Sequence, residues 1–539
     1  MEKDIVYIYD TTLRDGAQTS GIDFSVADKI AVAKMLDAVG VDYIEAGWYG
    51  ANDTDNEFFQ NLPSLQNASF TSFGMTRRGN KKVKDDAGFT TLLNTDARVV
   101  TLVAKTWDLH VSEALGVSLD ENVNMITDSI KYALPLMKEV NIDAEHFFDG
   151  YKANPEYALR CVTAARDAGA DWIILCDTNG GTMPDEIEKI IKEVVKHVPG
   201  DHLGIHCHND TGCAVANTLI AVECGVRQVQ GTVNGLGERC GNADLNTVIP
   251  DLVLKMGYKT NITDLKMLTK LSNFLCDRLN IPKNKFAPYV GARAFAHKGG
   301  LHVSAILKNP KCYEHISPEK VGNERKILVS SQSGRSNITA ILNNVGIDIE
   351  SLSKETVGKI LEEVKHKEFK EGITYDGAEA SFELMVRRTM GEVPHYFTLD
   401  SFRVFDEMRH NEKGKLVIFS DATVKILING KAYLEASEGD GPVDALANAM
   451  RKVLLPVYPE VDDLHLIDYK VRIINTEKGT GASPRVMVES SDKDGNRWNT
   501  VGVSKDIIDA SFTALCDSFI YKLFKEGVMC KNLEDDASA

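Results

Sequence analysis

The sequence lacks the long apolar runs that membrane-spanning helices require. No stretch approaches the roughly 18 consecutive apolar residues that cross a bilayer, although 43% of the residues are hydrophobic and 26% are charged. Met1-Glu2-Lys3-Asp4 leads almost directly into the apolar run Ile5–Tyr9, which leaves no room for a signal peptide. We therefore expect a globular, cytoplasmic protein.

The lack of paired cysteines and the shortage of basic residues further narrow the class of protein. None of the ten cysteines forms a Cys-x-x-Cys pair, which favours reduced thiols over a disulfide framework. Basic residues are outnumbered by acidic ones, 61 against 78, and the net charge of −17 argues against general nucleic-acid binding. An anionic substrate then needs a local basic or backbone-donor site. At 539 residues the chain should form two or three domains.

Short β-rich runs alternate with amphipathic helical stretches over the first 235 residues. Ser25 and Asp28 are typical of a helix start, and Gly40 is typical of its end. A doubly wound sheet is the alternative to a barrel, but the first strand–helix loop has no Gly-x-Gly-x-x-Gly fingerprint. Eight such repeats over about 250 residues predict an α/β fold with a (β/α)8 TIM barrel. The expected strands are Ile5–Tyr9, Val41–Ala46, Ser69–Gly74, Val99–Ala104, Ala144–Phe148, Trp172–Cys176, Leu203–His206 and Gln228–Val233.

The end of the seventh predicted strand carries two histidines, His206 and His208. Alternate side chains of a strand share a face, so both imidazoles project together while Cys207 points away. Asp15 follows the first strand, which only strand eight separates from strand seven in a closed barrel. We predict that Asp15, His206 and His208 bind one divalent metal, Mn, Co, Zn or Mg, with positions left open for substrate. A structural histidine pair is the alternative.

Other polar residues at the same rim indicate a reaction class. A metal with open positions can chelate a 2-oxo acid and polarise its ketone. Arg14 is a candidate for stabilising an oxyanion, Glu145 for accepting a proton with a raised pKa in an apolar setting, and Thr178 for donating a hydrogen bond to a substrate carboxylate. The alternatives are that Arg14 forms a surface ion pair, that Glu145 is a buried carboxylate whose hydrogen bonds are satisfied, and that Thr178 is structural.

Three motifs, in order, resemble one enzyme family. They are Asp10-Thr11-Thr12-Leu13-Arg14-Asp15-Gly16, His206-x-His208-Asn209-Asp210 and Gly235-x-Gly237-Glu238-Arg239-x-Gly241-Asn242. They resemble the metal-dependent TIM-barrel acyltransferases that include 2-isopropylmalate, homocitrate and citramalate synthases. The resemblance implies that Asp15, His206 and His208 bind the metal, that Asn242 completes the site, that Arg14 assists the enolate and oxyanion, and that Glu145 and Thr178 contact substrate.

Further segments look like the citramalate branch of that family. They are residues 45–52, 144–152, 176–182 and 295–303. This implies condensation of acetyl-CoA with pyruvate and then thioester hydrolysis, in isoleucine biosynthesis. Another 2-oxo acid as acceptor, a metal-dependent hydrolase and a non-catalytic sensor are the alternatives. Hydrolases of the amidohydrolase type carry His-x-His after the first strand rather than the seventh, which argues against that class.

Two residues beyond the barrel gain a role only through the resemblance. His302 matches a catalytic histidine of the family, and Tyr313 matches a tyrosine presented near the active site, both from a linker subdomain contributed across a homodimer. His297 is the alternative imidazole. The basic run Arg77–Lys82 is a candidate for CoA phosphates, although a solvated charged face is the preferred interpretation. Gln332–Ser336 matches a Ser-Gly-Arg turn of the family.

The C-terminal part shows a repeated β-hairpin-plus-helix pattern. Asn429-Gly430 is typical of a two-residue hairpin turn, and a second turn follows at Asp494-Gly495. The family places its dimerising, end-product-sensing domain here, which makes isoleucine a candidate effector; plain dimerisation is the alternative. The expected domains are the barrel at 1–275, a mostly helical linker at 276–392, the regulatory domain at 393–530 and an acidic tail at 531–539.

Overall fold

The computed structural model describes residues 4–327, 352–375, 377–410, 414–474 and 481–530, together with Leu342 and Ile347. The chain divides into two compact units, Met1–Phe295 with Ile316–Arg325, and Ala296–His315 with Lys326–Ala539. The expected domain limits at 275 and 392 remain a proposal. The tail 531–539 and the segment 332–336 lie outside the described residues.

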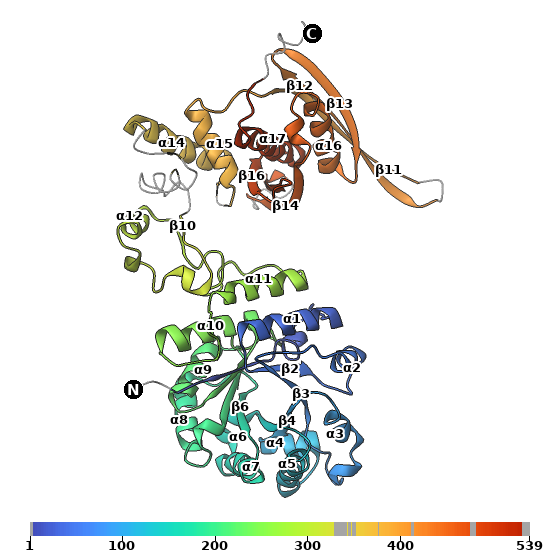
Figure 1. Cartoon of the computed structure of the whole chain (residues 1–539), viewed down its shortest axis with the longest axis vertical. Helices are drawn as coiled ribbons and strands as arrows, with labels where there is room; N and C mark the ends of the chain where they lie inside the picture. The colour runs from blue at the N-terminus through green and yellow to red at the C-terminus, as the bar shows by residue number, and fades with distance from the viewer. Residues whose placement is uncertain are drawn as a thin grey trace. The chain divides into compact units, whose positions relative to one another are not determined.

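The first unit is a closed barrel of parallel strands, as the sequence predicts (Figure 1). Consecutive strands pair in chain order, and β1 closes the ring against β8, with Asp10 beside Gly231. The strands are β1 (Tyr7–Asp10), β2 (Tyr43–Gly47), β3 (Ser69–Met75), β4 (Val99–Lys105), β5 (Glu139–Glu145), β6 (Trp172–Asp177), β7 (Leu203–Cys207) and β8 (Gln228–Gly231). The predicted fold class is confirmed.

The fifth strand differs from its predicted position. The sequence analysis placed it at Ala144–Phe148, whereas β5 ends at Glu145 and the next helix begins at Phe147. Residues 139–145 alternate polar and apolar side chains, and the polar residues Asn141 and Asp143 are buried. A run of apolar residues therefore predicts the bounds of a strand poorly where one face of that strand carries polar residues that are buried. The correction places Glu145 at the end of its strand.

Helices surround the barrel and cover its apolar outer face (Figure 1). In α1, Ser25 and Asp28 form a reciprocal capping box, and Gly40 ends the helix in the left-handed conformation at φ 98°. The helices are α1 (Val26–Val39), α2 (Asp53–Gln60), α3 (Ala87–Leu92), α4 (Asp108–His110), α5 (Leu119–Ala133), α6 (Phe147–Ala153), α7 (Pro155–Ala168), α8 (Pro184–Val194), α9 (Ala214–Glu223), α10 (Leu245–Pro250) and α11 (Met267–Leu279).

The interior of the barrel is polar. The Tyr9 hydroxyl donates to Glu45 at 2.6 Å and lies 3.0 Å from the Thr101 hydroxyl, which links β1 to strands β2 and β4. Glu45 and Thr101 are fully buried. Buried polar groups are normally hydrogen-bonded to one another, and such a network fixes side-chain positions. The interior therefore supports a defined polar site at the mouth of the barrel.

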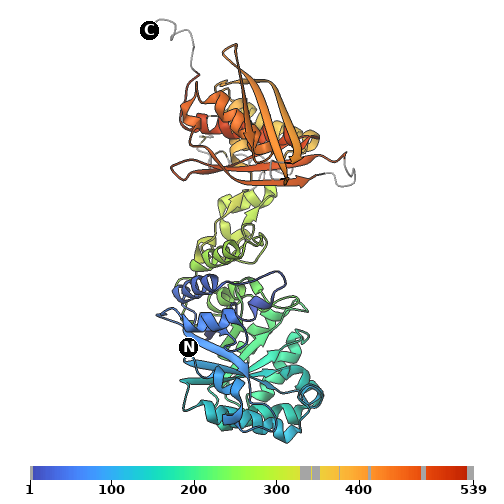
Figure 2. The same ribbon diagram turned by 90° about the vertical axis from the view of Figure 1, so that its right-hand side faces the viewer.

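The second unit contains two antiparallel sheets, each with a helix packed on it (Figure 2). The predicted hairpins are present, and each sheet has one further strand that the sequence analysis missed, β11 and β14. The elements are β9 (Ala296–His297), α12 (Gly300–Lys308), β10 (Lys326–Ile327), α14 (Lys354–His366), α15 (Glu379–Thr389), β11 (Thr398–His410), β12 (Leu416–Ile428), β13 (Lys431–Gly439), α16 (Pro442–Leu454), β14 (His465–Ile473), β15 (Pro484–Ser491), β16 (Arg497–Val503) and α17 (Ile507–Lys525).

None of the helices within the described part of the chain has the length and apolar content of a membrane span.

We expect Gly47→Ala to destabilise the barrel unit. Gly47 has φ 141°, and an added Cβ would lie 2.6 Å from the carboxylate of Asp55, which forms a buried ion pair with Lys29. Displacing that carboxylate should cost about 3 kcal/mol and lower the melting temperature, followed by circular dichroism, by roughly 6 °C or more. Gly181→Ala, whose Cβ meets nothing within 4 Å, is the matched control. Equal melting temperatures for both variants would contradict this prediction.

Candidate metal and substrate site

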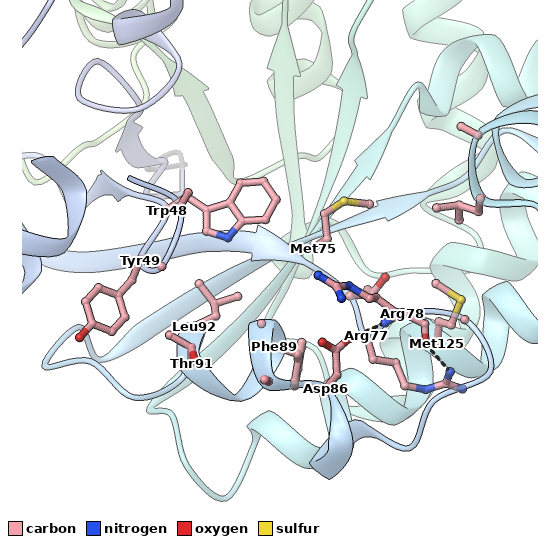
Figure 3. A pocket seen from close by; sticks show the side chains of 18 residues that line it. Trp48, Tyr49, Met75, Arg77, Arg78, Asp86, Phe89, Thr91, Leu92 and Met125 are labelled. Carbon is pink, nitrogen blue, oxygen red and sulfur yellow. Dashed lines mark hydrogen bonds between the residues drawn. The ribbon is translucent and has the colours of Figure 1, made fainter. Parts of the chain in front are cut away.

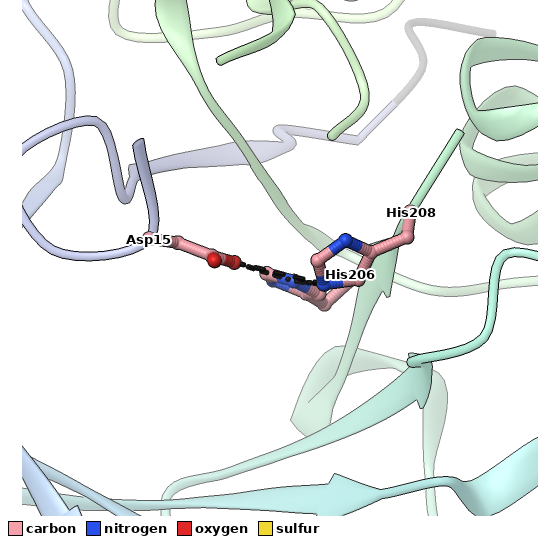
Figure 4. A group of neighbouring side chains, drawn as sticks. All are labelled: Asp15, His206 and His208. Carbon is pink, nitrogen blue, oxygen red and sulfur yellow. Dashed lines mark hydrogen bonds and ion pairs between the residues drawn. The ribbon is translucent and has the colours of Figure 1, made fainter. Parts of the chain in front are cut away.

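Three predicted metal ligands converge at the mouth of the barrel (Figure 4). The His206 Nε2 atom lies 3.2 Å from Asp15 Oδ2, and the His208 Nε2 atom lies 3.8 Å from the same oxygen. The two Nε2 atoms are 3.4 Å apart. All three side chains are buried. One carboxylate oxygen and two imidazole nitrogens thus face a common point.

Local sequence holds each ligand in place. After β1, the Asp15 amide donates to the Thr11 carbonyl at 2.9 Å, a turn that directs Asp15 back over the barrel. The His206 Nδ1 atom lies 3.0 Å from Gln230 Oε1. An amide oxygen only accepts, so Nδ1 carries the proton and Nε2 is left to coordinate. Cys207 is buried in the core outside the strands, as alternation predicts.

The protonation states of Asp15 and His208 suit a bound cation. Burial alone would raise the pKa of Asp15, but Arg14 and His206 outweigh it and hold that pKa well below its usual range. Burial lowers the pKa of His206, yet the Asp15 carboxylate raises it overall. Burial and the neighbouring His206 lower the pKa of His208 to about 4. Asp15 is therefore an anion and His208 is neutral at pH 7, as metal coordination requires.

The donor set fits a divalent metal. Asn242 pairs with His208 through a backbone bridge, and its amide nitrogen donates to the Leu236 carbonyl at 3.0 Å. Its buried Oδ1 atom has no hydrogen-bond partner among the described residues. An orphaned acceptor beside an Asp–His–His cluster is expected where a cation supplies the missing partner. Mixed nitrogen and oxygen donors suit Mn, Co, Zn or Mg.

Arg14 is held over the barrel mouth by a buried carboxylate. Its Nε atom lies 2.5 Å from Glu45 Oε1, and its guanidinium packs 3.8 Å above the ring of Phe73. Glu45 also accepts hydrogen bonds from Tyr9 and Thr11. The Nη1 atom of Arg14 lies 3.7 Å from Asp15. With Nε committed to Glu45, the terminal nitrogens remain beside the metal ligand, in the position that an oxyanion-stabilising group needs.

Glu145 is linked to Thr178 through His146, the next residue along the chain. The His146 amide, at φ 53° in the left-handed region, donates to the Thr178 hydroxyl at 2.9 Å. Because this hydroxyl oxygen accepts there, its proton remains available for another acceptor. Glu145 forms an ion pair with Lys105, and its side chain is 26% exposed. It is therefore more open than the apolar setting that the sequence analysis expected.

His302 and Tyr313 belong to the second unit, whereas the metal ligands lie in the first. Their rings stack with centroids 4.1 Å apart, and both side chains are exposed. The alternative, His297, is largely buried and its Nε2 atom lies 3.3 Å from Glu314. His302 and Tyr313 are thus more exposed than His297.

Three residues of the site escaped the sequence analysis as functional groups, namely Glu45, Lys105 and Asp143. Glu45 and Lys105 are charged residues within otherwise apolar strands, which is the signal that would have found them, whereas Asp143 lies in a strand that alternates polar and apolar residues. Asp143 is 4% exposed, and its Oδ1 atom has no partner among the described residues. Burial and the nearby Glu45 raise the pKa of Asp143 to about 7.

Sequence comparisons identify the family of each part of the chain. The family model for HMGL-like proteins matches residues 5–275, that for the homocitrate synthase post-HMGL domain matches 289–371, and that for the LeuA allosteric (dimerisation) domain matches 376–523. The chain is 51% identical to the (R)-citramalate synthase of Aquifex aeolicus, over 97% of this chain and 98% of the relative. The chain belongs to the citramalate synthase family.

Other relatives place the chain within the wider group. The (R)-citramalate synthase of Geobacter sulfurreducens is 50% identical over 97% of this chain and 98% of its own length. A 2-isopropylmalate synthase of Clostridium kluyveri is 32% identical over 97% of both chains. The predicted recognition is confirmed, and the chain is an acyltransferase of the citramalate synthase family with an HMGL-like barrel and a LeuA dimerisation domain.

We expect His206→Ala to abolish metal retention and activity together. Removal of one of the two imidazoles leaves Asp15 and His208 without the third ligand of the cluster. Metal content after gel filtration, measured by mass spectrometry, should fall at least about tenfold. His197→Ala, an exposed histidine on the barrel surface, is the control. A His206→Ala protein that is metal-replete and active would contradict the assignment.

Asp143→Asn should flatten the pH dependence of stability in the metal-free protein. The folded pKa of about 7 lies above the ordinary value of 3.8, so this carboxyl favours folding at low pH, and that contribution is lost as the pH rises through 7. Between pH 5.5 and 8.0 the wild type should lose about 2 kcal/mol more than the asparagine variant. The fall in melting temperature should differ by roughly 5 °C; identical pH profiles would refute the effect.

Proposed function

We propose that this protein condenses acetyl-CoA with pyruvate to give (R)-citramalate and CoA, in isoleucine biosynthesis. The observation that carries the proposal is the buried cluster of Asp15, His206 and His208 beside Arg14, in a chain whose relatives at 44–51% identity are named (R)-citramalate synthases. A divalent ion, Mn, Co, Zn or Mg, bound there supplies Lewis-acid polarisation of the acceptor's ketone. Asn242 is proposed as a further ligand.

The acceptor acid is oriented by the strand ends. Thr178 donates its hydroxyl proton to the acceptor carboxylate while accepting the His146 amide, and Arg14 faces the ketone oxygen. Glu145, at the end of β5, takes a proton from the acetyl methyl group, directly or through a water that it orients. The methyl carbon then forms a bond to the ketone carbon, and Arg14 stabilises the negative charge on oxygen, which is finally protonated.

Thioester hydrolysis completes the reaction. Water adds to the thioester carbonyl, the carbon–sulfur bond breaks, and CoA leaves as the thiol with a proton from the water. His302 and Tyr313 are proposed to act at this stage, presented by the partner subunit of a homodimer with shared active sites. The LeuA dimerisation domain supports oligomerisation. Isoleucine is the proposed effector of that domain, and the cytoplasm the proposed compartment.

A parallel acceptor assay tests the proposal. Thiol release from acetyl-CoA should be fastest with pyruvate and at least about tenfold slower with 2-oxoisovalerate, 2-oxobutyrate and 2-oxoglutarate, since one misfitting group commonly costs that much. Isoleucine should inhibit the pyruvate reaction, whereas leucine and lysine serve as controls. Faster turnover of 2-oxoisovalerate or 2-oxoglutarate would move the chain to the alternative acceptors, and no thiol release with any acid would overturn the condensation.

A further inference from the structure

Lys105 forms an ion pair with Glu145, the group proposed to take the proton from the acetyl methyl. The two residues end the neighbouring strands β4 and β5 and are partners in their parallel register. Four positions earlier on each strand, the Asn141 amide donates to the Thr101 hydroxyl at 3.4 Å inside the barrel. Because alternate residues of a strand share a face, Lys105 and Glu145 project from this same inner face at the barrel mouth.

The backbone on both sides of this ion pair is fixed by side-chain hydrogen bonds. The Asn122 amide donates to the Lys105 carbonyl at 2.8 Å, and the Thr106 hydroxyl donates to the Glu145 carbonyl at 2.9 Å. The Lys105 ammonium donates to Glu145 Oε2 and to no other described residue, and Glu145 Oε1 accepts from none of them. Two N–H donors of Lys105 and one carboxylate oxygen of Glu145 therefore remain for a substrate.

Other cations at this end of the barrel have different surroundings. Arg77 is 4% exposed and pairs with two acidic residues of α5, so it does not belong to a solvated face. Arg78 lines a cavity of about 640 Å³ where β2 and β3 end (Figure 3), and neither Lys105 nor Glu145 lines that cavity. In the proposed reaction Arg14 faces the ketone oxygen of the acceptor. Lys105 is thus the cation in direct contact with the proposed base.

We propose that Lys105 is a further catalytic residue, whose ammonium stabilises the enolate oxygen of the acetyl thioester while Glu145 takes the methyl proton. This inference rests on the proposed function and deepens it. As the carbon–hydrogen bond breaks, the proton passes to Oε1 of Glu145 and the electron pair enters the enolate. Negative charge thus moves from the carboxylate to the thioester oxygen. The ammonium, which holds the carboxylate before this step, donates a hydrogen bond to that oxygen during it.

The net charge of the site is the same before and after this step, because the carboxylate becomes neutral as the enolate becomes negative. A fixed cation in contact with both groups therefore favours the proton transfer without reorganisation of the site. The ion pair contributes little to the fold by itself, since desolvation largely offsets the attraction between partly buried charges. After condensation the product alkoxide takes up a proton, Glu145 releases one to solvent, and the ion pair with Lys105 forms again.

Lys105→Met should lower kcat for citramalate formation at least about 100-fold, as removal of one oxyanion donor commonly does. Metal content and the KM for pyruvate should stay within about twofold, because neither depends on the ammonium. Lys105→Arg keeps a cation and should be at least about tenfold more active than Lys105→Met. Lys138→Met is the matched control, since Lys138 pairs with Glu139 at the other end of β5 and is 59% exposed.

Binding of an enolate mimic separates contact with the substrate from mere orientation of Glu145. In full-length, metal-loaded Glu145→Gln protein the base is absent, so carboxymethyl-CoA, whose carboxylate resembles the enolate, reports its own contact with Lys105. Adding Lys105→Met to this variant should weaken carboxymethyl-CoA at least about tenfold in calorimetry, through loss of a charge-assisted hydrogen bond. The affinity for CoA should change less than about twofold. Equal affinities of both variants for carboxymethyl-CoA would show that Lys105 only orients Glu145, which overturns the proposal.

Failure of the inference and failure of the proposed function are distinguishable. If the wild type forms citramalate and Lys105→Met keeps the wild-type kcat, the role of Lys105 is refuted and the function stands. If Lys105→Arg is no more active than Lys105→Met, the cation is not what the reaction requires, and the inference fails in the same way. If the wild type releases no thiol with any acceptor acid, the proposed function fails, and the assignment of Lys105 falls with it.

Discussion

The structure depends on one buried electrostatic arrangement, the Asp15 carboxylate held between Arg14 and the two imidazoles. A buried carboxylate remains ionised only where cations or hydrogen-bond donors surround it. Arg14 supplies that charge, and Glu45 in turn holds Arg14 through a buried hydrogen bond. His206 and His208 then turn their Nε2 atoms to the same oxygen. The proposed metal binding and the proposed oxyanion stabilisation therefore share one charge network.

The polar interior of the barrel explains how that network is kept rigid. Tyr9, Thr11 and Arg14 all bond to Glu45, so strands β1 and β2 cannot shift without breaking buried hydrogen bonds. Gln230 on β8 fixes the ring of His206 in the same way. Outside the strands the core is apolar and packs the helices. The apolar core outside the strands therefore stabilises the barrel, whereas the polar interior positions the charged side chains.

Much of the site could be predicted from the sequence because its proposed metal ligands lie at or just after strand ends, at fixed spacing. His206 and His208 differ by two positions, and Asp15 follows the first strand, so a closed ring brings them together. The fifth strand was misplaced because Asn141 and Asp143 are polar residues that face a buried interior, where hydrophobic alternation gives no signal. Glu45 and Lys105 act through contacts with Arg14 and Glu145, which depend on strand register rather than on any local motif.

The central claim is that two imidazoles and oxygen donors at the barrel mouth hold the catalytic metal. X-ray absorption spectroscopy of the cobalt- or zinc-loaded protein tests it most directly. The account predicts a first coordination shell of nitrogen and oxygen atoms at roughly 2.0–2.2 Å, with the multiple-scattering pattern of two imidazoles and with no sulfur. A shell containing a sulfur scatterer, or one without imidazole, would place the metal elsewhere and contradict the account.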